Sequence, residues 1–185
     1  MQQTPVHDAS VPSPWVRRFL PLIPAGGRVL DLAAGQGRHT RLLRAKGYQI
    51  VAVDRDAAGL RAELTGDADL AIVEMDLEDG GPWRLGQGYD GIIVANYLHR
   101  PLLPALADAL APGGALIYET FMAGNERFGR PANPDFLLRP GELLVAFGDR
   151  LTVVAFEQGN VTTPRAAVIQ RIAAVKGEVG PLPPA

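Results

Sequence analysis

Residues 28–41, which read RVLDLAAGQGRHTR, constrain the fold of this chain more than any other stretch. A short apolar run ends near Asp31 and passes, through the small residues from Ala33 to Gly37, into a segment that can begin a helix. A buried parallel strand, a tight turn and a helix N-terminus produce this pattern. Small residues let a ligand lie against the backbone, and a helix N-terminus offers it free N–H groups. The stretch also fits an ordinary strand-to-helix turn, so the flanking sequence must distinguish a ligand-binding turn from a purely structural one.

Length and composition indicate one globular domain, residues 1–185, with a loose arm over 1–13 and a loose tail over 177–185. The absence of cysteine excludes disulfides, cysteine–zinc sites and thiol nucleophiles, and we predict no metal site. A net charge of −2 without a basic run disfavours nucleic acid as a partner but does not exclude it. We find neither a membrane-length apolar run nor a signal-peptide pattern, and therefore expect a cytoplasmic protein without a membrane partner.

Strand and helix patterns alternate along most of the chain. We expect helices over 13–20, 39–46, 56–64, 101–110 and 140–146, with Ser13 as the cap of the first. We expect strands over 29–32, 48–53, 70–75, 89–95, 115–121, 151–157 and 165–175, with a turn near Gly159 joining the last two. This order predicts an α/β fold: a doubly wound, mostly parallel sheet of seven strands that ends in an antiparallel strand pair.

Acidic residues stand at or near the ends of three successive predicted strands: Asp31, Asp54 and Asp76. In open α/β sheets, ligands bind along the carboxyl edge of the strands. A carboxylate at Asp54 can accept hydrogen bonds from both hydroxyls of a ribose, or it can cap the next helix, a role that Asp56 could also fill. Asp76 is placed to accept from the amino group of an adenine, or to cap a turn. A nucleoside-containing cofactor is therefore expected at this edge.

Five segments, in this order, resemble the successive motifs of class I S-adenosylmethionine-dependent methyltransferases: VLDLAAGQGRHT, VAVDRD, MDLED, YDGIIVANYLHR and LAPGGALIYETF. The resemblance covers about residues 28–121. The chain also resembles the compact small-molecule branch of this family, which includes tellurite-resistance-type methyltransferases. This resemblance rests on the size of the chain, the GRH after the glycines and the final strands. The resemblance implies a Rossmann-like fold. It also implies transfer of a methyl group from S-adenosylmethionine, with S-adenosylhomocysteine as the product.

The resemblance also implies a set of cofactor-binding residues: Asp31, Ala33, Gly35, Gly37, Arg38, His39, Asp54, Arg55, Asp76, Leu77, Asn96 and Tyr97. The first small position of the usual glycine triplet is Ala33 here, which narrows the turn. Arg38 and His39 would lie near the carboxylate of the cofactor, or they are surface groups of the helix. A nicotinamide or flavin enzyme would need a third glycine where Arg38 or Thr40 stands, which disfavours that alternative.

Catalysis of methyl transfer requires that the protein align the nucleophile, the methyl carbon and the sulfur, and that it exclude water. A base is needed only where the nucleophile carries a proton with a high pKa. His99, Tyr97 and Glu119 are the candidate catalytic residues, although His99 also fits a structural or surface role. No N-P-P-Y-like stretch follows the fourth strand, and the cysteine used for carbon-5 of cytosine is absent. We expect a small-molecule acceptor. An RNA or protein methyltransferase, or a cofactor-binding module without turnover, stays open.

Residues 122–139 form a long segment that mixes aromatic, charged and proline residues. Long loops in compact domains are usually functional or disordered. We expect this segment, with Trp15 and Tyr97, to cover the substrate, and Arg100 to attract an acidic acceptor. The alternatives are a purely structural loop, a core position for Trp15 and a solvated Arg100.

Overall fold

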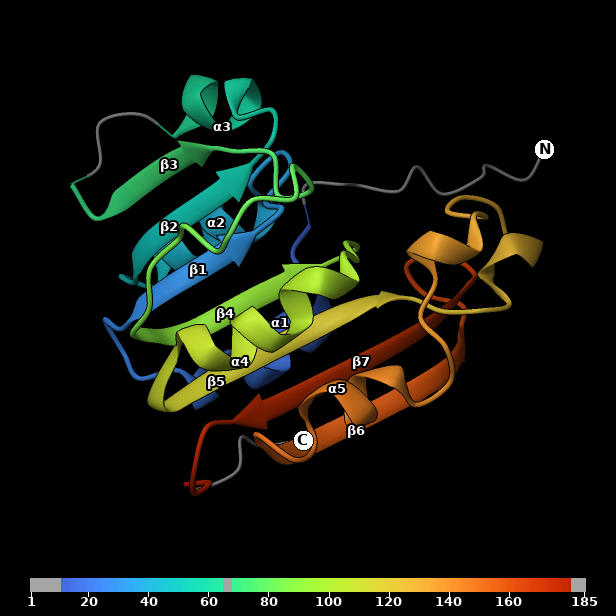
Figure 1. Ribbon diagram of the computed structural model, residues 1–185. Coiled ribbons are helices and arrows are strands. Elements are labelled where there is room, and N and C mark those ends of the chain that lie inside the picture. The colour runs from blue at the N-terminus through green and yellow to red at the C-terminus, as the bar shows by residue number, and fades with distance from the viewer. Residues whose placement is uncertain (1–10, 65–67, 181–185) are drawn as a thin grey trace.

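The computed structural model describes residues 11–64 and 68–180. Seven strands form one sheet in the order β3-β2-β1-β4-β5-β7-β6 (Figure 1). Strands β1 to β5 run parallel, whereas β7 is antiparallel to both β5 and β6. The predicted doubly wound sheet with an antiparallel C-terminal pair is thus confirmed. The strands are β1 (Arg28–Leu32), β2 (Gln49–Asp54), β3 (Leu70–Glu74), β4 (Tyr89–Ala95), β5 (Leu110–Phe121), β6 (Thr152–Val161) and β7 (Ala167–Val175).

Helices cover both faces of this sheet, with α4 and α5 on the face toward the viewer in Figure 1 and α1 and α2 behind it. Ser13 caps α1 as predicted, because its hydroxyl accepts the Trp15 N–H at 3.1 Å. Among the described residues, no helix is both long and apolar enough to cross a membrane. The α-helices are α1 (Pro14–Phe19), α2 (Arg38–Ala45), α3 (Ala58–Glu63), α4 (Leu103–Ala109) and α5 (Glu142–Phe147). Short 3-10 helices are η1 (Leu20–Leu22), η2 (Arg100–Leu102), η3 (Asn125–Arg127) and η4 (Pro134–Phe136).

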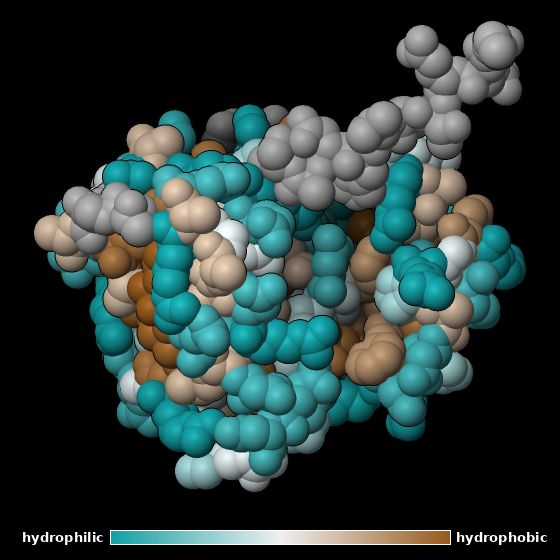
Figure 2. Space-filling model, turned by 90° about the horizontal axis from the view of Figure 1, so that it is seen from above, coloured by the Kyte–Doolittle hydropathy of each residue, from teal (hydrophilic) through white to brown (hydrophobic). Residues whose placement is uncertain are grey.

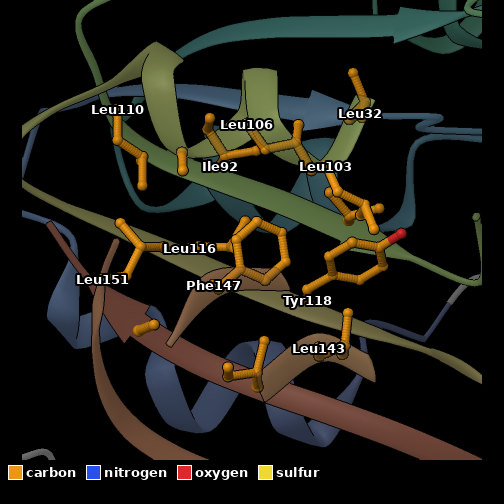
Figure 3. Packing of buried hydrophobic residues seen from close by; sticks show 14 of the residues in the cluster. Leu32, Ile92, Leu103, Leu106, Leu110, Leu116, Tyr118, Leu143, Phe147 and Leu151 are labelled. Atoms are coloured by element: carbon orange, nitrogen blue, oxygen red, sulfur yellow. The ribbon is translucent and has the colours of Figure 1, made fainter. Parts of the chain in front are cut away.

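Each face of the sheet carries its own apolar core. Figure 3 shows the core beneath α4 and α5, where Tyr118 of β5 packs against Phe147 with ring centroids 6.3 Å apart. On the opposite face, Trp15 and Phe19 of α1 pack with centroids 4.4 Å apart. These two layers leave the carboxyl ends of the parallel strands uncovered, and this edge is where a ligand can bind.

Trp15 belongs to the core, and the expectation that it covers a substrate is wrong. The side chain is 2% exposed, and its indole N–H donates to the carbonyl of Ile172 in β7 at 3.3 Å. Helix α1 lies against the sheet, so its large apolar side chains point into the protein interior. The alternative reading of Trp15 as a packing residue is confirmed.

Two predicted boundaries also differ from the structure. The predicted turn near Gly159 is wrong, because β6 continues to Val161 and Gly159 itself pairs with Ile169. The predicted helix over 101–110 begins with the 3-10 helix η2 and gives way to β5 already at Leu110, which pairs with Tyr89. In both places backbone pairing with a neighbouring strand prevails over the local turn signal.

Candidate functional site

Two strained backbone positions mark the point where the strand order reverses, between β1 and β4. Ala33 follows β1 with φ 55°, and Asn96 follows β4 with φ 58°. The strands are paired neighbours, with Leu32 opposite Val94. A left-handed backbone costs a residue with a Cβ about 1–2 kcal/mol, and such strain is concentrated at ligand sites. This reversal is also where open α/β sheets bind their ligands.

A cavity of about 460 Å³ opens at this reversal. We call it the acidic cavity, because its charged groups are three carboxylates and one arginine. Figure 2 looks down on this region and shows the surface hollowed between the main body and a smaller lobe at the right. The cavity is lined by Ala33, Asp54, Arg55, Met75, Asp76, Leu77, Glu78, Asn96, Tyr97, Leu98, Thr120, Phe121, Pro131 and Phe136. Its charge favours ligands rich in hydrogen-bond donors or positive charge and disfavours phosphates.

Asp54 connects the end of β2 to the glycine-rich turn. One carboxylate oxygen accepts the Gly35 N–H at 2.7 Å, and the other accepts the Asp56 N–H at 3.1 Å. The carboxylate that accepts from the start of α3 is that of Asp56, which bonds the N–H of Ala58. The helix-cap alternative for Asp54 is therefore wrong. Lone pairs remain on both Asp54 oxygens, and this half-buried group faces the acidic cavity.

Tyr97 places an unsatisfied hydroxyl at the acidic cavity. The oxygen is buried and has no hydrogen-bond partner among the described residues. Burial raises the pKa of Tyr97 above its usual range, and the negative charge of Glu78 adds to the shift. The phenol is thus neutral at physiological pH and suited to donate to a ligand rather than to act as a base.

Asp76 closes a turn and also lines the acidic cavity, and its role toward an adenine stays a prediction. Its carboxylate accepts the Glu78 N–H at 2.8 Å and so closes a turn, and the side chain is exposed and lines the acidic cavity. Arg55 and Leu77 line the same cavity. The residues assigned to the adenine and ribose side therefore lie together.

Asp31 and His39 lie beneath the turn and line neither this cavity nor the second cavity described below. Asp31 is 1% exposed and accepts the Thr40 hydroxyl at 2.6 Å, and burial raises its pKa to about 6. His39 is 3% exposed, and its Nε2 accepts the Ser13 N–H at 3.2 Å. Burial, and then the charge of Arg38, lowers the pKa of His39 to about 3. The contacts seen for both residues join β1 and α1 to the start of α2.

We expect Asp31 and His39 to oppose each other in the acid stability of the protein. Between 6.5 and about 3, His39 binds a proton only when the chain unfolds, so it lowers the free energy of unfolding as the pH falls. Between about 6 and 3.8, Asp31 binds a proton only in the folded chain, so it raises that free energy as the pH falls. Asp31→Asn should therefore reveal a decline of about 1.4 kcal/mol per pH unit on acidification. His39→Gln should reveal the opposite trend, a rise in the free energy of unfolding as the pH falls from about 6 to 3.8, because Asp31 is then unopposed. Urea unfolding at neutral and mildly acidic pH measures both, and equal pH profiles in all three proteins would contradict the assignment.

The glycines of the turn have different roles. A Cβ on Gly37, which has φ 78°, would lie 2.6 Å from Leu60 Cδ2, so this glycine allows α2 and α3 to pack closely. A Cβ on Gly35, with φ 56°, would meet no protein atom within 4 Å. The space above Gly35 is thus open to a ligand, whereas that above Gly37 is filled by the protein.

This difference predicts unequal costs for two matched substitutions. Gly37→Ala should lower the free energy of unfolding by about 2–4 kcal/mol, from overpacking plus backbone strain. Gly35→Ala should lower it by only about 1 kcal/mol, from backbone strain alone. Chemical denaturation of both variants measures the difference, and equal losses would contradict the packing role of Gly37.

A second cavity, of about 420 Å³, adjoins the acidic cavity and shares Asn96, Thr120 and Phe121 with it. We call it the basic cavity, because its charged groups are three arginines and one glutamate. The glutamate is Glu119, whose carboxylate lies 3.9 Å from the guanidinium of Arg171. Its charged lining is Arg38, Glu119, Arg165 and Arg171, and its apolar lining includes Val11, Pro12, Pro14, Phe121, Val161, Ala167 and Ile169.

The structure thus separates the candidate catalytic residues. Tyr97 lines the acidic cavity and Glu119 the basic cavity, whereas His99 precedes η2 and lines neither. Arg38, assigned to the cofactor, lies in the basic cavity.

Arg100 does not face an acceptor, and that expectation is wrong. Its guanidinium donates to both carboxylate oxygens of Glu142, at 2.6 and 3.0 Å, and to the carbonyls of Asp135 and Leu137, each at 2.8 Å. Buried Asn125 also holds the segment 122–139: it accepts the Val168 N–H and donates to the Pro131 carbonyl. The segment is therefore anchored to the body of the protein.

Several cavity residues were not among the site residues predicted from the sequence. Pro131 and Phe136 bring the segment 122–139 to the acidic cavity, and Thr120 and Phe121 form the wall between the cavities. The position of Thr120 near the end of a parallel strand was a usable signal. The contribution of Phe136 depends on how a long segment folds back, which carries no local signal.

The family model described as "Methyltransferase domain" matches residues 7–137. Among solved structures, N-methyltransferase NodS from Bradyrhizobium japonicum WM9 is 16% identical, with a TM-score of 0.68 and coverage of 94% of this chain and 100% of that chain. A TehB-like SAM-dependent methyltransferase from Corynebacterium glutamicum is 18% identical, with a TM-score of 0.64 and coverage of 88% and 86%. The 1,6-didemethyltoxoflavin-N1-methyltransferase from Burkholderia thailandensis, solved with bound 1,6-didemethyltoxoflavin and S-adenosylhomocysteine, is 19% identical, with a TM-score of 0.65 and coverage of 93% and 80%. None of the curated proteins matches the sequence.

Proposed function

The chain belongs to the methyltransferase domain family and uses S-adenosylmethionine, and we propose that the acidic cavity holds this cofactor while a small molecule accepts the methyl group. The observation that carries the proposal is Asp54. Its carboxylate lies at the end of β2, bonded to the Gly35 N–H and facing the cavity. A carboxylate in this position can accept hydrogen bonds from the hydroxyls of a ribose.

The other residues of the acidic cavity fit the same cofactor. Asp76 and Leu77 would bind the adenine, through a carboxylate acceptor and an apolar surface. Asn96 would lie beside the methionine part, and the unpartnered Tyr97 hydroxyl would donate to a cofactor atom. Excess negative charge favours a sulfonium cation and opposes a pyrophosphate, as in NAD. Asp31, Gly37 and His39 would act indirectly, by holding the turn and α2 in place.

When bound, S-adenosylmethionine supplies a methyl group that is already electrophilic. The chain therefore needs to align the acceptor and exclude water. Asn96, Thr120 and Phe121 form the wall between the cavities and would line the path of transfer. Where the acceptor carries a tightly held proton, Glu119 is the candidate base, because the raised pKa of Tyr97 makes its phenol a poor base near neutral pH.

Activity is tested with a panel of small molecules incubated with the protein and S-adenosylmethionine, with a gain of one methyl group read by mass spectrometry. We expect methylation of a small molecule together with formation of S-adenosylhomocysteine. Transfer to RNA or protein alone would contradict the small-molecule acceptor. Cofactor binding without transfer to any class would favour the binding-module alternative. The cytoplasmic location expected from the sequence stays a prediction, which cell fractionation tests.

A further inference from the structure

The acidic and basic cavities carry opposite charge and share one wall. The acidic cavity has three carboxylates against Arg55, and the basic cavity has three arginines against Glu119. Such a division suits two ligands of opposite charge that meet at the wall, better than it suits one ligand spread over both cavities.

The arginines of the basic cavity are not equally available to a ligand. Arg171 is engaged, because it donates to Glu157 at 2.5 and 3.0 Å and stacks over the Trp15 ring at 4.6 Å. Arg165 has no carboxylate partner among the described residues. It lies over the Phe121 ring at 5.1 Å, and its single hydrogen bond, to the Arg130 carbonyl, is long at 3.4 Å.

Arg165 is also far in sequence from the cofactor motifs, since it lies between β6 and β7. Of the other two arginines that line the basic cavity, Arg38, at the start of α2, likewise has no ion-pair partner among the described residues. An unpaired guanidinium beside an aromatic face is a suitable site for a carboxylate on an apolar body.

The rest of the basic cavity is mainly apolar. Phe121, Val161, Ala167 and Ile169 contribute from β5, β6 and β7, and the N-terminal segment closes the cavity with Val11 and Pro12. A volume of about 420 Å³ is sufficient for a small organic molecule. An inorganic anion would leave this apolar surface without a partner.

We propose that the basic cavity binds the methyl acceptor, and that this acceptor is an organic anion with an apolar body and a carboxylate or similar group held by Arg165. The body packs on Phe121 and Ile169, and the nucleophilic atom points to the wall of Asn96 and Thr120. This inference rests on the proposed function, because it assigns the acceptor of the same enzyme. It replaces the expectation from the sequence that Arg100 attracts the acidic group.

The competing occupant is the carboxylate of the cofactor itself, which Arg38 could reach from the basic cavity. Arg165 provides the test, because it comes from the connection between β6 and β7, whereas Arg38 follows the glycine-rich turn directly. A change at Arg165 that weakens binding of an organic anion but not of the cofactor identifies the acceptor as the occupant. If the basic cavity is the acceptor site, it stays free for a probe when the protein is saturated with S-adenosylhomocysteine. If it holds part of the cofactor, S-adenosylhomocysteine fills it and excludes the probe.

The test uses two matched pairs of probes, benzoate with benzamide and indole-3-acetate with indole-3-acetamide. Each probe is titrated into the full chain saturated with S-adenosylhomocysteine, and amide NMR shifts report the affinity and the site. We expect the anion of each pair to bind about 10-fold more tightly than its amide, and binding to weaken with salt. The shifts should include Thr120, Phe121 and Ile169.

Arg165→Gln should weaken anion binding by about 10-fold and leave affinity for S-adenosylhomocysteine unchanged. Arg17→Gln, an exposed arginine outside both cavities, is the charge-matched control and should change neither. The inference is overturned if the amides bind as well as the anions, if no probe binds, or if S-adenosylhomocysteine displaces them. Failure of S-adenosylhomocysteine to bind at all would instead contradict the proposed function.

Discussion

Asp54→Ala is expected to weaken binding of S-adenosylhomocysteine by roughly 10- to 100-fold, which corresponds to about 1.4–3 kcal/mol. Two losses combine in this variant. The ribose hydroxyls lose a charged acceptor, and the Gly35 N–H, now bonded at 2.7 Å, loses its partner at the turn. Titration calorimetry of the variant and the parent measures the change, with circular dichroism to establish that the fold is retained.

A neighbouring carboxylate supplies the control for this prediction. Asp56 lies two residues further on, is exposed, and bonds only backbone at the start of α3. Asp56→Ala should leave the affinity within about twofold, because the group lies outside the acidic cavity. If both variants bind like the parent, the ribose does not lie against Asp54.

Arg100→Ala is expected to lower the free energy of unfolding by about 2–4 kcal/mol, because it removes four hydrogen bonds and leaves Glu142 without its partner. The pair is partly buried, with side chains 33% and 17% exposed, so solvent weakens it less than a surface pair. The variant should also release the segment 122–139, which brings Phe136 to the acidic cavity. Urea denaturation measures the stability, and limited proteolysis measures the release.

Arg150 offers the matched control. It pairs with Asp108 through more exposed side chains and donates to one carbonyl, that of Pro104. Arg150→Ala should cost about 1 kcal/mol or less. Equal losses in the two variants, or an unchanged proteolysis pattern for Arg100→Ala, would contradict the anchoring role.

The ion pair of Arg100 and Glu142 also predicts a pH dependence. Burial alone would raise the pKa of Glu142, but hydrogen bonds from Arg100 and the Arg139 N–H hold it below its usual value. A carboxyl group with a lowered pKa stabilises the fold above its unfolded pKa, and this contribution is lost as the pH falls through the folded value. The difference in stability between parent and Arg100→Ala should therefore shrink in acid. A constant difference would contradict this explanation.

The succession of strands and helices along the chain was predictable because each strand–helix unit carries a local signal. That signal is an apolar run for the strand, with glycine or proline at the ends of the strand or helix. The position of the candidate site followed from topology, since parallel strands place Asp54, Asp76 and Asn96 at one edge of the sheet, where they line the acidic cavity. These inferences require only the direction of each strand and the position of a residue on it.

Individual side-chain roles were less predictable, because their partners lie far away in sequence. Trp15 donates to a carbonyl 157 residues on, and Arg100 binds Glu142, 42 residues on. His39 accepts from Ser13 in a segment that the sequence assigned to a loose arm. No local pattern distinguishes an arginine that binds a ligand from one that holds a loop, or a buried histidine from a surface one.

The most direct test of this account is a crystal structure of the protein with S-adenosylhomocysteine bound. We expect the ribose hydroxyls within hydrogen-bond distance of the Asp54 carboxylate, the adenine beside Asp76 and Leu77, and the Tyr97 hydroxyl donating to the ligand. The cavity that contains Arg165 should remain free for the acceptor. Electron density for the nucleoside in the basic cavity, or outside both cavities, would contradict the assignment.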